Sequence, residues 1–247
     1  MARHKLFDPD ATTPFALSRS KVDLFLQCPR CFYLDRRLGI ARPAGFPFNL
    51  NSAVDALLKT EFDRYRREGK PHPLMVEAGI NAVPATHPLL DTWRENFKGV
   101  RTVHEPTGFE LFGAIDDLWR DLDTDELIVV DYKATSKATE VTLNADWQIG
   151  YKRQMEFYQW LLRQRGEVVA KRGWFVYCNG RRDLPGFDAR LEFTIKLIPY
   201  DGDDGWIEGA LAGIKQTLAA TAPPSINGAC EYCTFASRAA GGERDAG

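Results

Sequence analysis

The chain has 247 residues, and its 44% hydrophobic and 12% aromatic residues are sufficient for a packed core. With 32 basic and 34 acidic residues its net charge is −2, which excludes a globally basic nucleic-acid-binding protein and leaves any such surface to a local patch. Because no apolar run approaches the length of a membrane span and the N-terminus lacks a signal-peptide core, we expect a cytoplasmic protein without a membrane partner.

The first helical stretch is predicted in "SRSKVDLFLQCPRCFYLDRRLG". Ser20 and Asp23 have the spacing of a capping box at its start, and Pro29 interrupts it. Cys28 and Cys31 therefore lie at a joint between two helical segments.

A long helix is predicted over residues 50–67, where apolar side chains recur at helical spacing: Val54, Leu57, Leu58, Phe62 and Tyr65. The segment "GKPHPL" ends this helix. A less regular part follows to about residue 100, with a short helix expected in "PLLDTWRENF".

From residue 101 the pattern changes, and "TGFELFGAIDDLWRDLDTDELIVVDYK" predicts two strands around an acidic turn. A hairpin centred between Asp123 and Thr124 places Asp116 opposite Asp131, with Cβ atoms roughly 5 Å apart. Two carboxylates at this distance repel each other unless a positive charge lies between them. Carboxylate oxygens suit Mg²⁺ or Mn²⁺, ions that support phosphoryl chemistry.

Lys133 follows Asp131 by two positions and therefore projects from the same face of the strand. Beside a bound cation, its ammonium group could orient a water molecule or offset charge that develops on a phosphate. The alternative is a solvated surface pair of Asp131 and Lys133, with Asp116 and Asp117 ending an edge strand.

A helix is predicted over residues 147–165, and one stripe of it contains Trp147, Tyr151, Gln154, Tyr158 and Leu161. Gln154 interrupts this apolar stripe. It is either a boundary residue bonded to backbone or, with Tyr158 one turn later, a polar arm that points into a site. Strands are expected in "KRGWFVYCN" and "LEFTIKLI", followed by a last helix in "DDGWIEGALAGIKQTLAAT".

Four of the five cysteines occur as two CxxC pairs, Cys28 with Cys31 and Cys230 with Cys233, while Cys178 stands alone. A reducing compartment argues against structural disulfides, so we interpret the pairs as one four-thiolate metal site. The residue types suit either a [4Fe–4S] cluster or Zn²⁺. The alternative of a thioredoxin-like redox motif in "CPRC" lacks the preceding strand of that fold.

The segments "GAIDD", "IVVDYK" and "QMEFY", in this order and spacing, resemble motifs of the RecB-like branch of the PD-(D/E)XK nuclease superfamily. The segments "LSRSKVDLFLQCPRCFYL" and "CEYC" resemble the cysteine-bearing ends of its iron-sulfur members, which include CRISPR-associated RecB-like exonucleases and AddB-type helicase-nucleases. In outline the resemblance covers residues 17–235.

The resemblance implies roles for individual residues. Asp116 and Asp131 would be metal ligands together with the backbone carbonyl of Tyr132, and Lys133 would be the catalytic lysine. Gln154 and Tyr158 would form the helix motif that supports the site.

The sequence departs from the family pattern at two places. Where many members carry Gly-x-x-x-His with a metal-binding histidine, this chain has Asn51 and Asp55, so Asp55 is either a replacement ligand or an exposed helix residue. His104 is a second candidate for approach to the site. The iron-sulfur members have one cysteine near the N-terminus and three near the C-terminus, whereas here Ala239 and Ala240 stand where the last is expected. Cys31 would supply the missing ligand.

We therefore expect an α/β protein with a restriction-endonuclease-like mixed central sheet flanked by helices, its chain ends joined by the four cysteines. Tails at 1–17 and 236–247 would enclose one nuclease-like domain, 18–235, with a helical part (18–100), a sheet core (101–200) and a C-terminal helix and cysteine pair (204–235).

The predicted function is that of a Mg²⁺- or Mn²⁺-dependent DNA nuclease with exonuclease-like action on single strands or duplex ends. Its partners would be DNA and a helicase or a CRISPR or repair complex. The alternatives are a non-catalytic DNA-binding or scaffold subunit that retains the fold, and a redox or metal-sensing protein built on the cysteines. The last leaves the hairpin acids unexplained.

Overall fold

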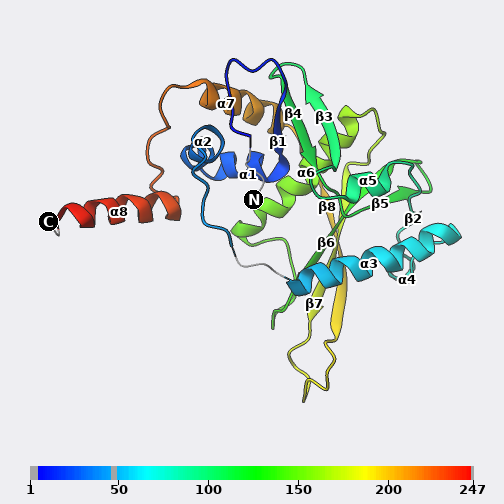
Figure 1. The fold of residues 1–247 in the computed structure, drawn as a ribbon. Helices are drawn as coiled ribbons and strands as arrows, with labels where there is room; N and C mark the ends of the chain where they lie inside the picture. Colours follow the sequence, from blue (N-terminus) through cyan, green and yellow to red (C-terminus); the bar gives the residue numbers. More distant parts are fainter. Residues whose placement is uncertain (1–4, 46–48, 246–247) are drawn as a thin grey trace. The chain divides into compact units, whose positions relative to one another are not determined.

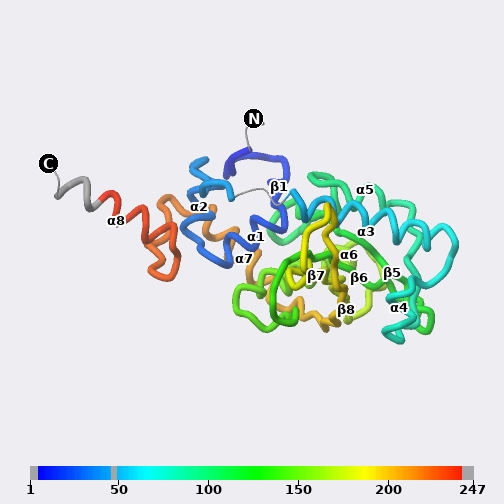
Figure 2. Tube along the Cα trace, turned by 90° about the horizontal axis from the view of Figure 1, so that it is seen from below, coloured from blue at the N-terminus to red at the C-terminus, as the bar shows by residue number. Residues whose placement is uncertain are grey.

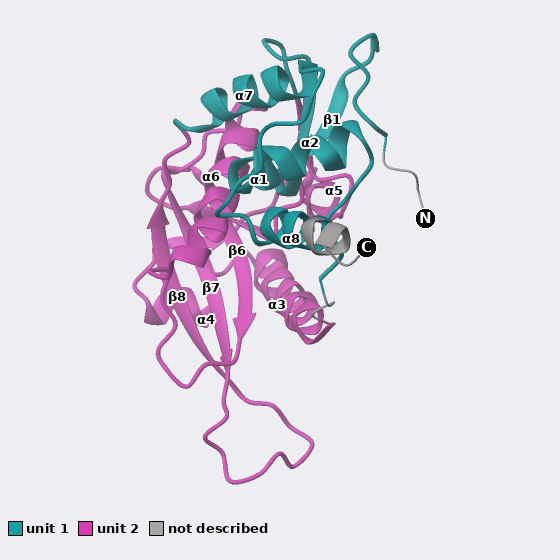
Figure 3. Cartoon of the chain, turned by 90° about the vertical axis from the view of Figure 1, so that its left-hand side faces the viewer, with its two compact units in different colours: residues 1–46, 103–111, 205–247 teal, residues 47–102, 112–204 magenta. Residues whose placement is uncertain are grey.

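The computed structural model describes residues 5–45 and 49–245 and divides into two compact units (Figure 3). Unit 1 comprises residues 1–46, 103–111 and 205–247, and unit 2 comprises residues 47–102 and 112–204. Residues 1–4 of the predicted N-terminal tail and 246–247 of the predicted C-terminal tail lie outside the described residues.

Unit 2 is built on a five-stranded sheet whose strands lie in the order β2 (Ala82–Pro84), β5 (Asp117–Asp121), β6 (Leu127–Thr135), β7 (Arg172–Gly180) and β8 (Phe193–Asp201) (Figure 1). β6 and β7 are parallel, and the other neighbours are antiparallel. The predicted mixed central sheet is therefore confirmed. β6 is the middle strand, and it carries the "IVVDYK" motif.

The hairpin of β5 and β6 has the predicted register. Asp117 lies opposite Val130 and Trp119 lies opposite Ile128. Continued by one residue beyond the start of β5, this register brings Asp116 to the position opposite Asp131. Since directly paired residues share a face of the sheet, the two acids project from the same side.

Helix α3 (Asn49–Glu68) covers one face of this sheet, where Leu58 and Phe62 pack with Trp119, Val130 and Tyr132. The short helices α4 (Pro73–Glu77) and α5 (Leu90–Arg94) belong to the irregular part that the sequence predicted before residue 100.

Helix α6 (Ile149–Gln164) follows the 3₁₀ turn η1 (Asp146–Gln148) and packs against β7, where Met155 lies over Gly173. The predicted apolar stripe on this helix was wrong at its first member. Trp147 belongs to η1 and is 56% exposed, because the helix begins only at Ile149. Tyr158 and Leu161 are buried as the stripe predicted.

Unit 1 contains helices α1 (Arg19–Gln27), α2 (Pro29–Arg37), α7 (Ile207–Ala219) and α8 (Glu231–Asp245). Figures 1 and 2 show α1 and α2 beside α7, so that segments from both ends of the sequence pack together. The break at Pro29 is confirmed. The capping box was wrong: α1 begins at Arg19, and the hydroxyl of its N-cap Ser18 contacts the Ser20 hydroxyl instead of the backbone.

The remaining strands are β1 (Phe15–Ser18), β3 (Val100–His104) and β4 (Phe109–Gly113), which form a second sheet in the order β1-β4-β3. β1 occupies the last residues of the predicted N-terminal tail, and α8 extends through most of the predicted C-terminal tail. Across residues 5–45 and 49–245, none of the helices combines the length and the hydropathy that crossing a membrane requires.

The space around two glycines, Gly173 in the contact between β7 and α6 and Gly209 in α7, predicts opposite effects when each is replaced by alanine. A Cβ atom at Gly173 would clash with Met155 Sδ and lie 2.9 Å from the Val129 carbonyl oxygen, so Gly173→Ala should destabilise the protein by about 1 to 3 kcal/mol. Gly209 is a helical position in α7 with no atom within 4 Å of such a Cβ, and Gly209→Ala should stabilise by about 0.5 to 1 kcal/mol. Chemical denaturation measures both; a neutral Gly173→Ala would contradict the close packing.

Candidate active site and cysteine cluster

Asp131 lies in the buried centre of β6, and its side chain is fully inaccessible to solvent. Its carboxylate forms an ion pair with the ammonium group of Lys133, yet among the described residues neither oxygen accepts a well-oriented hydrogen bond. The predicted alternative of a solvated Asp131–Lys133 surface pair is therefore wrong. A buried carboxylate with so few partners is costly, and a cation between its oxygens would stabilise it.

Asp116 precedes β5, and its Oδ2 accepts a hydrogen bond of 2.8 Å from the backbone N–H of Tyr132. Burial and, secondly, the charge of Asp131 raise the pKa of Asp116 to about 7, against the opposing effects of Lys133 and Lys59. The two acids thus interact electrostatically, as the hairpin register requires. Their donor set, two carboxylates that repel each other, fits a divalent cation.

Lys133 faces α6, where its Nζ lies 3.4 Å from Gln154 Oε1 and 4.7 Å from the ring centroid of Tyr151. Gln154 Nε2 in turn donates to the hydroxyl of Tyr158 at 3.1 Å. Burial alone lowers the pKa of Lys133, but Asp131 and Asp116 outweigh it, and the net pKa is raised. Lys133 is therefore an ammonium ion at neutral pH, held in place by α6.

The five residues predicted as catalytic thus meet on one face of unit 2: Asp116, Asp131, Lys133, Gln154 and Tyr158. Their roles, and the Tyr132 carbonyl as a ligand, stay predictions. Tyr151 was not among the predicted site residues. Its place on the helical stripe, one turn before Gln154, was the signal that it would face Lys133.

Asp55 on α3 affects the electrostatics of this site, but its carboxylate is not grouped with those of Asp116 and Asp131. Its carboxylate pairs with Lys59 at 2.8 Å, and its charge contributes to the raised pKa of Asp116. Outside the four cysteines, the described residues contain no group of three or more His, Cys, Asp or Glu ligand atoms within 4.8 Å of one another. Asn51 donates to the Ala134 carbonyl at 3.3 Å.

His104 belongs to unit 1, and both of its ring nitrogens are engaged there. Nε2 lies 2.8 Å from Glu208 Oε2, and Nδ1 lies 2.8 Å from the Thr107 hydroxyl. The structure thus assigns His104 hydrogen-bonding partners of its own, and its approach to the acids stays a prediction.

A buried charge network on the α3 side of the sheet was missed by the sequence interpretation. Asp117 is fully buried and forms ion pairs with Arg66 of α3 and Arg94 of α5, and its Oδ2 accepts a 2.6 Å hydrogen bond from the Tyr132 hydroxyl. Arg94 also donates to the backbone carbonyl of Asp116 at 3.0 Å. The network therefore fixes the backbone on both strands of the hairpin next to the candidate ligands.

The four paired cysteines come together in unit 1, as predicted from their spacing. All four are buried, and the sulfur atoms of Cys28 and Cys233 are 3.6 Å apart, as are those of Cys31 and Cys230. Burial raises the pKa of the Cys31 thiol to about 12. Burial acts in the same sense on Cys230, but hydrogen bonds from the Cys233 backbone and neighbouring thiols lower its pKa to about 7. Such a group of thiols suits a metal that replaces their protons.

A family model described as "PD-(D/E)XK nuclease superfamily" matches residues 16–238. No curated protein is significantly similar to the chain. A solved structure described as "Crystal structure of SSO0001" is 17% identical, with a TM-score of 0.39, over 92% of this chain and 86% of that one.

Two aspartates contact the same pair of arginines in this network, and replacing each by asparagine should have unequal effects on the free energy of unfolding. Asp117→Asn should lower the free energy of unfolding by about 3 to 5 kcal/mol, because Arg66 and Arg94 lose their buried counter-charge. Asp63 contacts the same two arginines from a partly exposed position, and Asp63→Asn should cost at most about 1 kcal/mol. Equal losses in urea denaturation would show that Asp117 is not the centre of the network.

The raised pKa of Asp116 predicts how stability depends on pH without metal. The unfolded chain ionises this group near its ordinary pKa of 3.8, whereas the folded protein retains the proton up to about pH 7. Stability therefore falls as the pH rises through this interval, and Asp116→Asn should remove that part of the loss. Melting curves between pH 5 and pH 8, with chelator present, should show a gain for Asp116→Asn that grows up to about pH 7 and then levels off. The exposed Asp91→Asn is the control, and an equal gain there would refute the assignment.

Proposed function

Because the chain belongs to the PD-(D/E)XK nuclease superfamily, we propose that it is a Mg²⁺- or Mn²⁺-dependent deoxyribonuclease of the RecB-like type that acts as an exonuclease on single strands or duplex ends. The observation that supports this most is the buried Asp131, whose oxygens accept no well-oriented hydrogen bond from residues 5–45 and 49–245 and which interacts with Asp116 and Lys133. Three neighbouring ionisable side chains, buried together, are difficult to explain as a feature that stabilises the fold.

In this proposal Asp116 and Asp131 hold the cation, with the Tyr132 carbonyl as a further ligand. When bound, the cation polarises a phosphate oxygen and favours the ionisation of water. The raised pKa of Lys133 keeps it positively charged, so it stabilises negative charge on the phosphate rather than accepting a proton. Gln154 and the ring of Tyr151 hold its ammonium group in position, and Tyr158 holds Gln154.

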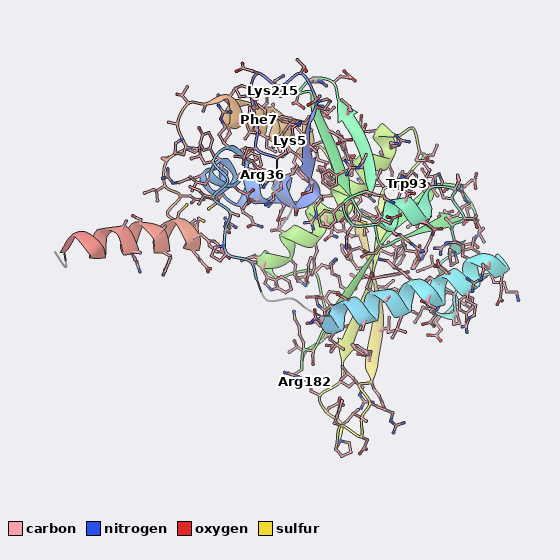
Figure 4. The ribbon with its side chains drawn as sticks, in the orientation of Figure 1. Lys5, Phe7, Arg36, Trp93, Arg182 and Lys215 are labelled. Carbon is pink, nitrogen blue, oxygen red and sulfur yellow. The ribbon has the colours of Figure 1, made fainter. Side chains whose placement is uncertain are left out.

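The DNA strand is proposed to follow a groove of about 310 Å³ at the end of β6, where Ala134 lines it on the α3 side of the sheet, and to pass around the end of β6 to reach Lys133, which projects from the opposite side. Its walls include Asn51 of α3, the end of β6, and Arg181 and Arg182 after β7. Arg181 pairs with Asp183 and Glu192, whereas Arg182 is exposed and has no ion pair within the described part of the chain (Figure 4). Arg182 is therefore the arginine of this groove best placed to contact a phosphate.

The remaining details rest on the sequence motifs alone. These are the RecB-like branch, a helicase or a CRISPR or repair complex as partner, a [4Fe–4S] cluster or Zn²⁺ at the cysteines, and a cytoplasmic location. They stay predictions.

A non-catalytic DNA-binding or scaffold subunit is the second candidate, and one observation favours it. Asp55, which stands at the place of the family's histidine, is paired with Lys59 rather than directed at a third ligand position. Retained DNA binding without cleavage in either Mg²⁺ or Mn²⁺ would identify this function.

The nuclease proposal is tested by separating catalysis from stability. Asp131→Asn should abolish Mn²⁺-dependent cleavage of DNA and remove most of the stabilisation that Mn²⁺ gives the parent, because one of the two carboxylate ligands is lost. Without metal, the loss of the buried counter-charge of Lys133 opposes the relief of the repulsion with Asp116, so Asp131→Asn should change stability less than Asp117→Asn does. Lys133→Ala should also lose cleavage yet still be stabilised by Mn²⁺, because the ligands remain. Melting curves with and without Mn²⁺ and a cleavage assay decide the matter; full activity of Asp131→Asn would end the assignment.

The proposed groove predicts a matched pair of effects on DNA binding. Arg182→Ala should weaken binding and reduce the slope of log affinity against log salt by about 1, because one phosphate contact is lost. Arg172 lies at the other end of β7, paired with Asp201, and Arg172→Ala should bind DNA as the parent does. Binding titrations at several salt concentrations measure this, and a salt-independent affinity would contradict the groove.

A further inference from the structure

The sulfur atoms of the cysteine cluster lie unusually close together. Cys28 and Cys233, and Cys31 and Cys230, have Sγ–Sγ distances of 3.6 Å, and Cys31 and Cys233 are 3.8 Å apart. All four sulfurs lie within 4.8 Å of one another. These distances join both CxxC pairs into one set rather than two separate ones.

The spacing distinguishes between the two metal centres that four cysteines can bind. With Zn–S bonds of about 2.3 Å, the edge of a regular tetrahedron of sulfurs is about 3.8 Å long. In a [4Fe–4S] cluster each thiolate binds a different iron at a corner of the cube, so the cysteine sulfurs are separated by on the order of 6 Å. The observed Sγ–Sγ distances of 3.6 to 3.8 Å match the edge of the zinc tetrahedron. Because all four sulfurs lie within 4.8 Å of one another, they are too close together for the thiolates of a [4Fe–4S] cluster.

The surroundings of the sulfurs are those of a closed site. Each cysteine is buried, so a single ion with four thiolates would have no open coordination position. Cys28 caps the N-terminus of α2, where its Sγ accepts the backbone N–H of Cys31 at 3.4 Å. The guanidinium group of Arg42 lies 3.4 Å from Cys230 Sγ and offsets part of the negative charge of the thiolates.

We propose that Cys28, Cys31, Cys230 and Cys233 hold one tetrahedral Zn²⁺ ion with a structural role, in place of the iron-sulfur cluster that the sequence resemblance implies. The ion connects the joint between α1 and α2 to the first turn of α8, which are about two hundred residues apart in sequence. The inference uses only residues of unit 1, and it stands whether or not the protein is a nuclease.

The test uses the full-length protein, purified without oxygen from cells supplied with both iron and zinc. Elemental analysis should find one zinc per chain without acid-labile sulfide, and the protein should be colourless. X-ray absorption at the zinc edge should show four sulfur neighbours at about 2.3 Å. Replacement of the ion by Co²⁺ should give the visible absorption bands of a tetrahedral thiolate site.

Two variants identify the ligands. Cys230→Ser should lose most of the bound zinc, whereas Cys178→Ser should retain it, because Cys178 is buried in β7 and is not one of the four grouped cysteines. If Cys230→Ser fails to fold, the absorption measurement on the unaltered protein still decides. Iron with acid-labile sulfide and iron–iron scattering would overturn the proposal, as would a folded protein that binds neither Zn²⁺ nor Co²⁺.

Discussion

Repulsion between two carboxylates is the constraint on which the rest of unit 2 depends. The register of the β5–β6 hairpin, continued by one residue before β5, places Asp116 opposite Asp131, and neither strand can shift by one residue without turning its apolar side chains to the wrong face. The two carboxyl groups therefore lie close together at a buried position, which is electrostatically unfavourable. Lys133 offsets part of the charge, and the pKa of Asp116 is nevertheless raised to about 7.

The alternation of side chains along β6 separates two electrostatic systems. Tyr132 projects toward α3 and donates to Asp117, whose charge is balanced by Arg66 and Arg94. Asp131 and Lys133 project toward α6, where Lys133 is the ion-pair partner of Asp131 and the pKa of Asp116 nevertheless stays raised. One side of the sheet is thus a saturated network that stabilises the backbone, while the other retains the capacity to bind a cation.

The sequence predicted those parts of the structure that follow from local pattern. The mixed sheet, the hairpin register, the long helix α3 and the convergence of the cysteines all rest on periodicity or on the spacing of a few residues. The charge network around Asp117 could not be predicted, because its arginines come from two separate helices and meet only in the folded chain. The exposed Trp147 was missed because a 3₁₀ turn and the first turn of an α-helix have similar side-chain spacing. The proposal of zinc rather than iron likewise rests on distances, since both centres use the same residue types.

The central claim is that Asp116 and Asp131 together bind a divalent cation. Crystals of the protein grown with Mn²⁺ and measured at the manganese absorption edge test it most directly. An anomalous peak is expected between the two carboxylates, with the Lys133 ammonium group displaced from Asp131 toward Gln154. Manganese bound elsewhere, with Lys133 still paired to Asp131 and no peak between the acids, would contradict it.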